Sequence, residues 1–337
     1  MAGSLGRNRQ HQRLRRPQYL TRFVIRNLRT PFVNAISSRR GALWALAAMV
    51  LIWAYSWIVM KQVLRYVGPF DFAAMRYMGG AVVLFALLLL RGESLKAPPL
   101  KLTILVGLCQ TTAFQALTQW ALVSGGAGRV SLFAYTMPFW VVLIAWLILA
   151  ERPSSRQWLG LALAALGLLC VIEPWRGLGD THSTLLAIGG GAVWGLGTVL
   201  SKRMFERHAP SPLSFTAWQM LFGALALTAI ALIVPSRPIE WTTAFFAGLA
   251  YSVVLASSVA WLLWLLVIQR LPATIAGLTS LAVPVVAVLM AWLILHEKPD
   301  AMEGLGITLI VCGLLAVSGR GRDGSRTEPA SAARLET

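Results

Sequence analysis

The residue best placed to do chemistry is Arg76, which interrupts a long apolar stretch in the sequence FDFAAMRYMGG. A charged side chain near the centre of a membrane-spanning helix costs about 2.5–3.5 kcal/mol on insertion scales, so it should face water, a partner or a ligand. Two interpretations follow. The guanidinium binds the carboxylate of a small molecule, or it reaches toward the membrane surface and pairs structurally with a group such as Asp71.

Polar and aromatic side chains in other apolar stretches could complete a binding cavity. Gln110, Gln115 and Gln119 fall on neighbouring positions of one helix face, because residues four apart share a face. They could line a path through the protein or hydrogen-bond to adjacent helices. The remaining cavity candidates, for which core packing is the alternative in the case of the tryptophans, are Trp53, Trp194, Gln219, Tyr251 and Ser257.

The residue types that catalysis and metal binding need are not clustered. The four His lie in the N-terminal tail, in loops or at a helix end, and no Asp, Glu or His lies near the centre of an apolar block. The three Cys sit within apolar blocks, which indicates buried thiols rather than disulfides or a metal site. No GxxxxGKS or GxxxxGKT phosphate-binding loop is present. We therefore expect no enzyme activity, no metal, no cofactor and no obvious proton relay.

The chain that must position these residues is strongly apolar. Of its 337 residues 57% are hydrophobic and 13% charged, and the mean hydropathy is +0.67. The apolar residues form blocks that can cross a hydrocarbon core of about 30 Å as helices, in which backbone groups are satisfied within the segment. We expect an all-α polytopic membrane protein with ten spans, at residues 42–60, 71–90, 102–123, 129–149, 157–173, 184–202, 213–234, 243–267, 273–295 and 303–318.

The net charge of +17 has an uneven distribution that favours a membrane over a nucleic acid as partner. Most of the 30 Lys and Arg fall in segments expected on one side of the membrane, which predicts cytoplasmic N- and C-termini. Residues 1–40 form a basic arm without Asp or Glu, interpreted as a tail near anionic lipid, an upstream start or a targeting peptide. Residues 319–337 are expected to be a disordered cytoplasmic tail.

The chain contains an internal repeat. The sequence AWLILAERP, ending at Pro153, returns as AWLILHEKP, ending at Pro299. Similar echoes extend over residues 41–175 and 183–318, each with five apolar blocks. Because five is odd, the second copy crosses the membrane in the opposite sense, as in many secondary transporters. The repeated residues include the pairs Trp53 and Trp194, Lys61 and Lys202, Pro138 and Pro284, and Glu151 and Glu297.

Three of these repeated features have a predicted role. Pro138 and Pro284 each remove a helix hydrogen bond, so we expect kinks or hinges there. Glu151 and Glu297 lie at helix exits beside a basic residue, where an ion pair is favoured over a proton-carrying site. Glycines seven residues apart in the fifth and tenth blocks allow close helix approach, with a homodimer interface as a second interpretation.

Together, the Trp-rich first block ending in Lys61, Arg76 in the second, Pro138 in the fourth and the Glu151 exit, all but Arg76 repeated in the second half, resemble the EamA-type transporters of the drug/metabolite transporter superfamily. One departure is that Gln219 occupies the position of Arg76 in the second half.

The resemblance implies ten helices, a bacterial inner-membrane location and transport of small metabolites such as amino acids. We expect a secondary transporter that exports a small organic metabolite by alternating access. The alternatives are a drug or toxic-compound efflux carrier, and a non-transporting receptor or scaffold of the same fold.

Overall fold

The computed structural model describes residues 39–125, 127–176, 180–295 and 301–318, and the regular elements in these ranges are all helical. This confirms the all-α prediction. In chain order the helices are α3 (Arg39–Val63), α4 (Pro69–Leu90), α5 (Leu100–Val106), η1 (Gly107–Ala113), α6 (Phe114–Ser124), α7 (Ala127–Ala134), α8 (Met137–Leu149), α9 (Ser155–Ile172), η2 (Pro174–Arg176), α10 (Thr181–His208), α11 (Pro212–Ile233), α12 (Thr243–Tyr251), η3 (Ser252–Val259), α13 (Ala260–Arg270), α14 (Ala273–Thr279), α15 (Ala282–Leu295) and α16 (Ala301–Ser318).

Eight spans in the described residues are long and apolar enough to cross a membrane, from Trp44–Val63 to Thr243–Arg270. They coincide with the first eight predicted blocks. The last two blocks contain shorter apolar helices, Ala273–Ala287 and Gly304–Ala316. The count of ten spans therefore stays a prediction, although α15 and α16 occupy the predicted places.

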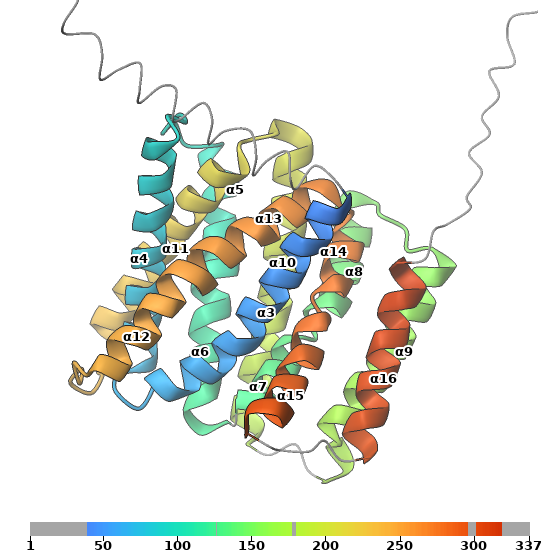
Figure 1. Ribbon diagram of the computed structural model, residues 1–337. Coiled ribbons are helices and arrows are strands. Elements are labelled where there is room, and N and C mark those ends of the chain that lie inside the picture. Colours follow the sequence, from blue (N-terminus) through green and yellow to red (C-terminus); the bar gives the residue numbers. More distant parts are fainter. Residues whose placement is uncertain (1–38, 126, 177–179, 296–300, 319–337) are drawn as a thin grey trace, which may run out of the picture.

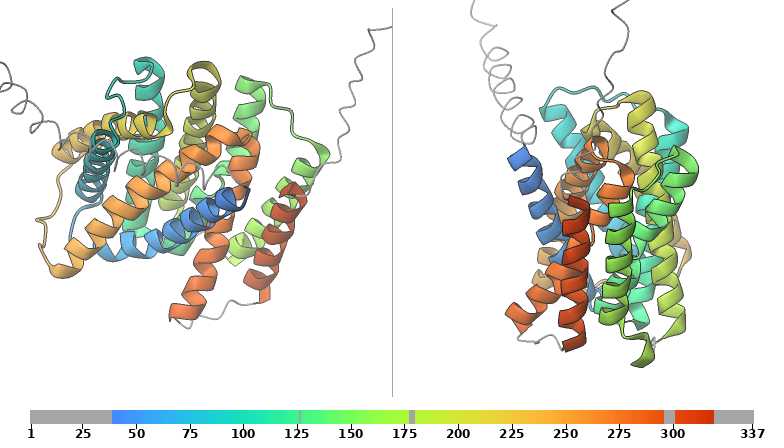
Figure 2. Two further views of the ribbon diagram at one scale, coloured as in Figure 1. Left: turned by 45° about the horizontal axis from the view of Figure 1, so that its top comes forward. Right: turned by 90° about the vertical axis from the view of Figure 1, so that its right-hand side faces the viewer.

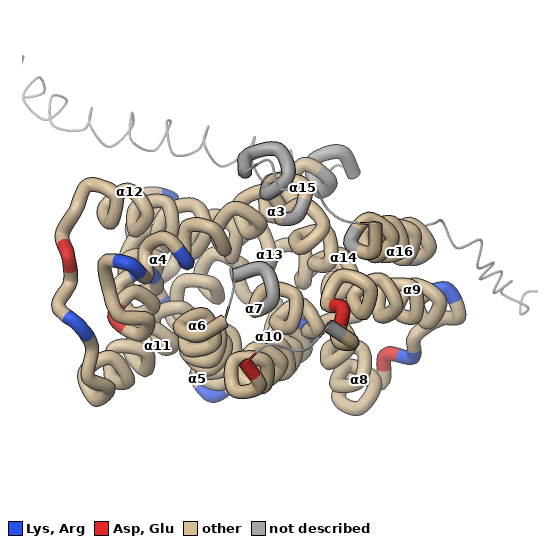
Figure 3. Tube along the Cα trace, turned by 90° about the horizontal axis from the view of Figure 1, so that it is seen from below, with Lys and Arg blue, Asp and Glu red and all other residues tan. Residues whose placement is uncertain are grey.

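The two halves run in opposite directions through the bundle. The helix α3 begins, and α16 ends, at the same end of the molecule, the upper end in Figure 1, which we call the tail end. The opposite end is called the far end. While α3 runs from the tail end to the far end, its repeat counterpart α10 runs from the far end to the tail end (Figure 1). Viewed from the far end, nearly the whole described trace is uncharged (Figure 3).

Both halves break their helices at corresponding places. The third and eighth spans contain the π-helical segments η1 and η3, a wider winding that occurs mostly as short bulges, often at functional sites. The fourth and ninth spans are each interrupted by a two-residue turn, between α7 and α8 and between α14 and α15. Pro138 and Pro284 lie in the first turn after these breaks, where a missing backbone N–H costs little. The helix breaks thus lie just before the two prolines rather than at them, and a hinge at Pro138 or Pro284 stays a prediction.

The helices α9 and α16 pair at one edge of the bundle (Figures 1 and 2). A Cβ atom on Gly306 would lie 2.6 Å from the carbonyl oxygen of Gly167, and one on Gly313 would lie 2.7 Å from that of Gly160. The glycine seam is therefore occupied within one chain, where it lets two helix backbones touch. A homodimer stays a prediction that needs another surface.

We expect Gly306→Ala to destabilise the protein and Gly304→Ala to leave it unchanged. A Cβ at Gly306 meets backbone and Val171, whereas one at Gly304, on the same helix, meets nothing within 4 Å. Overpacking of this kind costs about 1–3 kcal/mol. Thermal unfolding of the two variants in detergent measures the difference, and equal midpoints would show that the α9–α16 contact is not tight.

Candidate functional site

Arg76 lies on α4 in the centre of the bundle with only 2% of its surface exposed. Its Nε donates a hydrogen bond to Ser257 Oγ at 2.7 Å, and Nη1 lies 2.9 Å from the sulfur of Met60. The guanidinium also stands over the ring of Tyr77, 5.1 Å from its centroid. Arg76 therefore contacts both halves of the repeat.

No described carboxylate forms an ion pair with Arg76, and Asp71, five positions earlier on the same helix, is not its partner. A buried guanidinium with five N–H donors has more donor capacity than one hydroxyl and one thioether can satisfy. Burial of an unpaired charge is costly, so the site is well suited to accept an anionic group.

Four tryptophans form an aromatic cluster beside Arg76: Trp53 on α3, Trp194 on α10, and Trp261 and Trp264 on α13. The ring of Trp53 lies 5.7 Å from that of Trp194 and 5.5 Å from that of Trp261. Such edge-to-face contacts favour a fixed geometry. Because Trp53 and Trp194 are repeat counterparts, their contact places the axis that relates the two halves at this cluster.

A small cavity of about 30 Å³ separates the aromatic cluster from Arg76. That space suffices for one or two water molecules, but not for a metabolite. Two polar atoms of lining residues, Gln115 Oε1 and Trp194 Nε1, are buried without a hydrogen-bond partner in the described part of the chain. Unsatisfied atoms of this kind are costly and mark places where water or a ligand belongs. The walls come from Trp53, Ser56, Trp57, Met60, Arg76, Tyr77, Phe114, Gln115, Thr118, Tyr135, Trp194 and Trp261.

The structure brings Trp53, Arg76, Gln115 and Trp194 to this cavity, with Ser257 bonded to Arg76. Other predicted cavity residues lie elsewhere among the described helices. Gln110 faces α10, where its amide bonds to Thr198 and Ser201.

Gln219 accepts a hydrogen bond from Thr111 at 3.0 Å, and the hydroxyl of Tyr251 donates to the carbonyl of Ile52 at 2.7 Å. Gln119 is fully buried and does not line the cavity. Substrate contact by any of these residues stays a prediction.

Sequence reasoning missed several cavity residues, including Tyr77 and Trp261. The indole N–H of Trp261 donates to the hydroxyl of Tyr77 at 3.2 Å, which fixes both rings beside Arg76. The sequence did offer an indication of Trp261, because it is the counterpart of Trp120 in the internal repeat. The two environments differ, however, because Trp120 is 49% exposed while Trp261 is 2% exposed.

Two repeat-motif residues, Glu151 and Lys61, hydrogen-bond to the backbone at helix termini, at opposite ends of the bundle. At the tail end, the carboxylate of Glu151 accepts hydrogen bonds from the backbone N–H groups of Ala273 and Thr274, at 3.2 and 3.3 Å, and from the Thr274 hydroxyl. It thereby caps the N-terminus of α14, which carries partial positive charge. An ion pair of Glu151 with a basic residue at this helix exit stays a prediction.

At the far end, the ammonium of Lys61 donates to the carbonyls of Leu122 and Gly125, at 2.9 and 3.0 Å, and so caps the C-terminus of α6. Its counterpart Lys202 instead lies 3.9 Å from Glu206 on its own helix. Glu297, the counterpart of Glu151, lies outside the described residues.

Apolar spanning helices in two oppositely oriented halves, meeting at a buried cationic and aromatic centre, define a multi-pass membrane transporter rather than an enzyme. The chain belongs to the EamA-like transporter family, whose model matches it twice, over residues 39–173 and 182–319. The resemblance seen in the repeat motifs is thereby confirmed.

Among curated relatives, the chain is 28% identical over 277 residues to the uncharacterised transporter YoaV of Bacillus subtilis, covering 79% of this chain and 93% of that protein. It is 26% identical over 293 residues to a probable amino-acid metabolite efflux pump of Escherichia coli, covering 82% and 94%. One solved crystal structure matches with a TM-score of 0.69 at 21% identity, over 83% of this chain and 97% of the other, which supports the fold. The chain is thus a multi-pass bacterial membrane protein of the transporter class.

Proposed function

We propose that the chain is a secondary transporter that exports a small carboxylate-bearing metabolite, such as an amino acid, by alternating access. The observation that carries this proposal is Arg76, a buried guanidinium that faces a cavity without a carboxylate partner among the described residues. A planar guanidinium binds a carboxylate through two parallel hydrogen bonds, which supplies both affinity and orientation.

The aromatic cluster supports a substrate with an apolar or aromatic portion next to its carboxylate. Trp53 and Trp194 line the cavity that Arg76 also borders. The same cluster favours one alternative, efflux of an amphipathic drug or toxic compound, which would use the rings more than the arginine. The name of the Escherichia coli relative agrees with the metabolite proposal.

The size of the cavity supports a transport cycle with more than one conformation. About 30 Å³ is far below the several hundred Å³ of a small-molecule site, so the halves must separate to admit substrate. The contact of Glu151 with α14 ties the first half to the second at the tail end, and it would hold that end closed in this conformation. With the tail end cytoplasmic, as the charge distribution predicts, this conformation is closed toward the cytoplasm.

The proposal is tested with purified protein in proteoliposomes and pairs of labelled amino acids and the amines that lack only their carboxylate. We expect saturable flux for at least one acid, exceeding that of its amine at least about a hundredfold, because the amine leaves the guanidinium unpaired. A pH gradient across the vesicles separates proton-coupled from facilitated flux. Equal flux of acid and amine would contradict a carboxylate anchor, and absence of flux for amino acids, other metabolites and drugs would favour the non-transporting alternative.

A further inference from the structure

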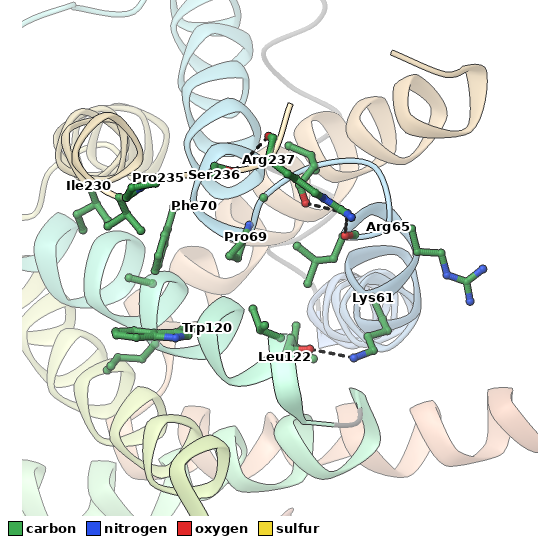
Figure 4. A pocket seen from close by; sticks show the side chains of 17 residues that line it. Lys61, Arg65, Pro69, Phe70, Trp120, Leu122, Ile230, Pro235, Ser236 and Arg237 are labelled. Atoms are coloured by element: carbon green, nitrogen blue, oxygen red, sulfur yellow. Dashed lines mark hydrogen bonds between the residues drawn. The ribbon is translucent and has the colours of Figure 1, made fainter. Parts of the chain in front are cut away.

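A second and much larger cavity, of about 920 Å³, opens at the far end of the bundle (Figure 4). It lies between the end of α3, the start of α4, the end of α6 and the segment that follows α11. Its size is at the upper end of the range for pockets that bury small molecules. None of its lining residues borders the small cavity beside Arg76.

The wall of this far-end cavity is almost wholly apolar. Phe70 and Trp120 meet edge to face across it, with ring centroids 6.0 Å apart, and Leu117 and Ile230 extend the wall. Part of the wall faces outward, since Trp120 is 49% and Val123 is 59% exposed. An apolar, outward-facing surface within the spanning region is solvated by lipid chains rather than by water.

The rim of the cavity is basic. Lys61, Arg65 and Arg237 border it, and these are the only Lys and Arg whose side chains are described at the far end. The side chains of Lys61 and Arg237 donate hydrogen bonds to backbone carbonyls, while Arg65 extends away from the apolar wall (Figure 4). None of the described residues that line the cavity is acidic.

The nearest acidic residues along the chain do not neutralise this rim. Asp71 and Glu240 lie in the segments next to it, yet neither forms an ion pair with Lys61, Arg65 or Arg237 among the described residues. Three positive charges therefore lie at the mouth of an apolar cavity, and none of them is in an ion pair with a described carboxylate. This combination matches an amphipathic anion with a long apolar portion.

We propose that the far-end cavity binds an anionic phospholipid, with an acyl chain against Phe70, Leu117 and Trp120 and with the phosphate group close to Lys61, Arg65 and Arg237. The site is independent of the substrate that Arg76 binds. Because the lipid would contact α3, α4, α6 and the segment after α11 at once, it would join elements of both halves at the far end. The protein would then prefer anionic over zwitterionic lipid.

Native mass spectrometry of the full chain in detergent tests the preference, with phosphatidylglycerol and phosphatidylcholine of identical acyl chains as probes. We expect at least tenfold tighter retention of phosphatidylglycerol. One basic residue near an anionic headgroup contributes about fivefold in affinity, so Arg65→Gln should lower phosphatidylglycerol binding by about that factor. The side chain of Arg65 makes no hydrogen bond or ion pair among the described residues, and its backbone N–H, which donates to Gln62, is kept in Arg65→Gln, so the replacement should not affect folding.

The matched control is Lys96→Gln with Lys101→Gln, which removes two exposed charges at the tail end and should leave the preference intact. Equal retention of the two lipids by the wild type would overturn the proposal, as would equal effects of the control pair and of Arg65→Gln.

The position of the lipid is tested by fluorescence quenching with phosphatidylglycerol brominated on its acyl chains. We expect the quenched fraction to fall in Trp120→Phe, and binding to fall in Val123→Trp, which fills the cavity from an exposed position. Quenching that is unchanged in Trp120→Phe would overturn the assignment. Binding of inorganic phosphate with the same dependence on Arg65, without lipid binding, would show instead an entrance for soluble anions.

Discussion

Replacement of Arg76 by glutamine is expected to abolish carboxylate transport while leaving the protein as stable as the wild type or more stable. Truncation of one partner of a buried charged hydrogen bond costs about 2–5 kcal/mol, which lowers flux at low substrate concentration by a factor of about thirty to a few thousand. Without substrate, however, the guanidinium has no carboxylate partner among the described residues, so its removal relieves the cost of a buried charge.

The two readouts separate the two interpretations of Arg76. Flux in proteoliposomes and the thermal midpoint in detergent are measured on the same preparation, with Arg76→Lys as an intermediate that keeps the charge but loses the planar pair of donors. Arg91→Gln is the control, since it makes the same change in a surface ion pair with Glu93 at the end of the same helix. A variant at Arg76 that loses flux only because it unfolds would return this residue to a structural role.

Glu151→Gln is expected to favour conformations that are open at the tail end. The carboxylate accepts three hydrogen bonds from the start of α14, including two backbone N–H groups. Loss of its charge at a helix N-terminus weakens the closed conformation by about 1–2 kcal/mol, which shifts the balance between conformations about tenfold. The rate of export at saturating substrate should fall, because reclosure at the tail end becomes less favourable.

Access to the tail end is measured by the rate at which a maleimide reacts with Val141→Cys in a background without the native cysteines. Val141 is fully buried against α14, where a Cβ on Gly277 would lie 3.3 Å from its Cβ. Glu151→Gln should raise the rate about tenfold. Glu206→Gln, which touches only the ion pair with Lys202 on the surface of α10, should not. Equal rates in all three proteins would show that Glu151 does not hold the tail end closed.

Much of the fold could be predicted because the repeat and the apolar blocks each have a direct physical meaning. Blocks of spanning length predicted helices, and the eight longest described spans coincide with them. The breaks were harder to locate. The prolines predicted kinks near α8 and α15, but η1 and η3 contain no proline, and their wider winding depends on packing between helices that local sequence does not reveal.

Site residues could be predicted from sequence where a polar or charged side chain would be costly in lipid. They could not be predicted where a side chain binds backbone groups of a distant helix. Arg76, Ser257, Trp53 and Trp194 were all candidates, although only the structure shows that they converge. The capping of α14 by Glu151 joins groups 122 positions apart, and its partners are backbone N–H groups that any residue except proline carries. Trp261 was overlooked because the repeat alone does not show that it is buried while its counterpart Trp120 is exposed.

The contact between Trp53 and Trp194 has a geometric consequence. Exchange of the shapes of two halves about an axis carries most contacts into different ones, but a contact between counterparts on that axis is carried onto itself. The contact between the two tryptophans would then be kept in both end states of the transport cycle, while the helix contacts at the two ends of the bundle differ between them. Its ring–ring geometry would be an internal reference against which opening at either end can be measured.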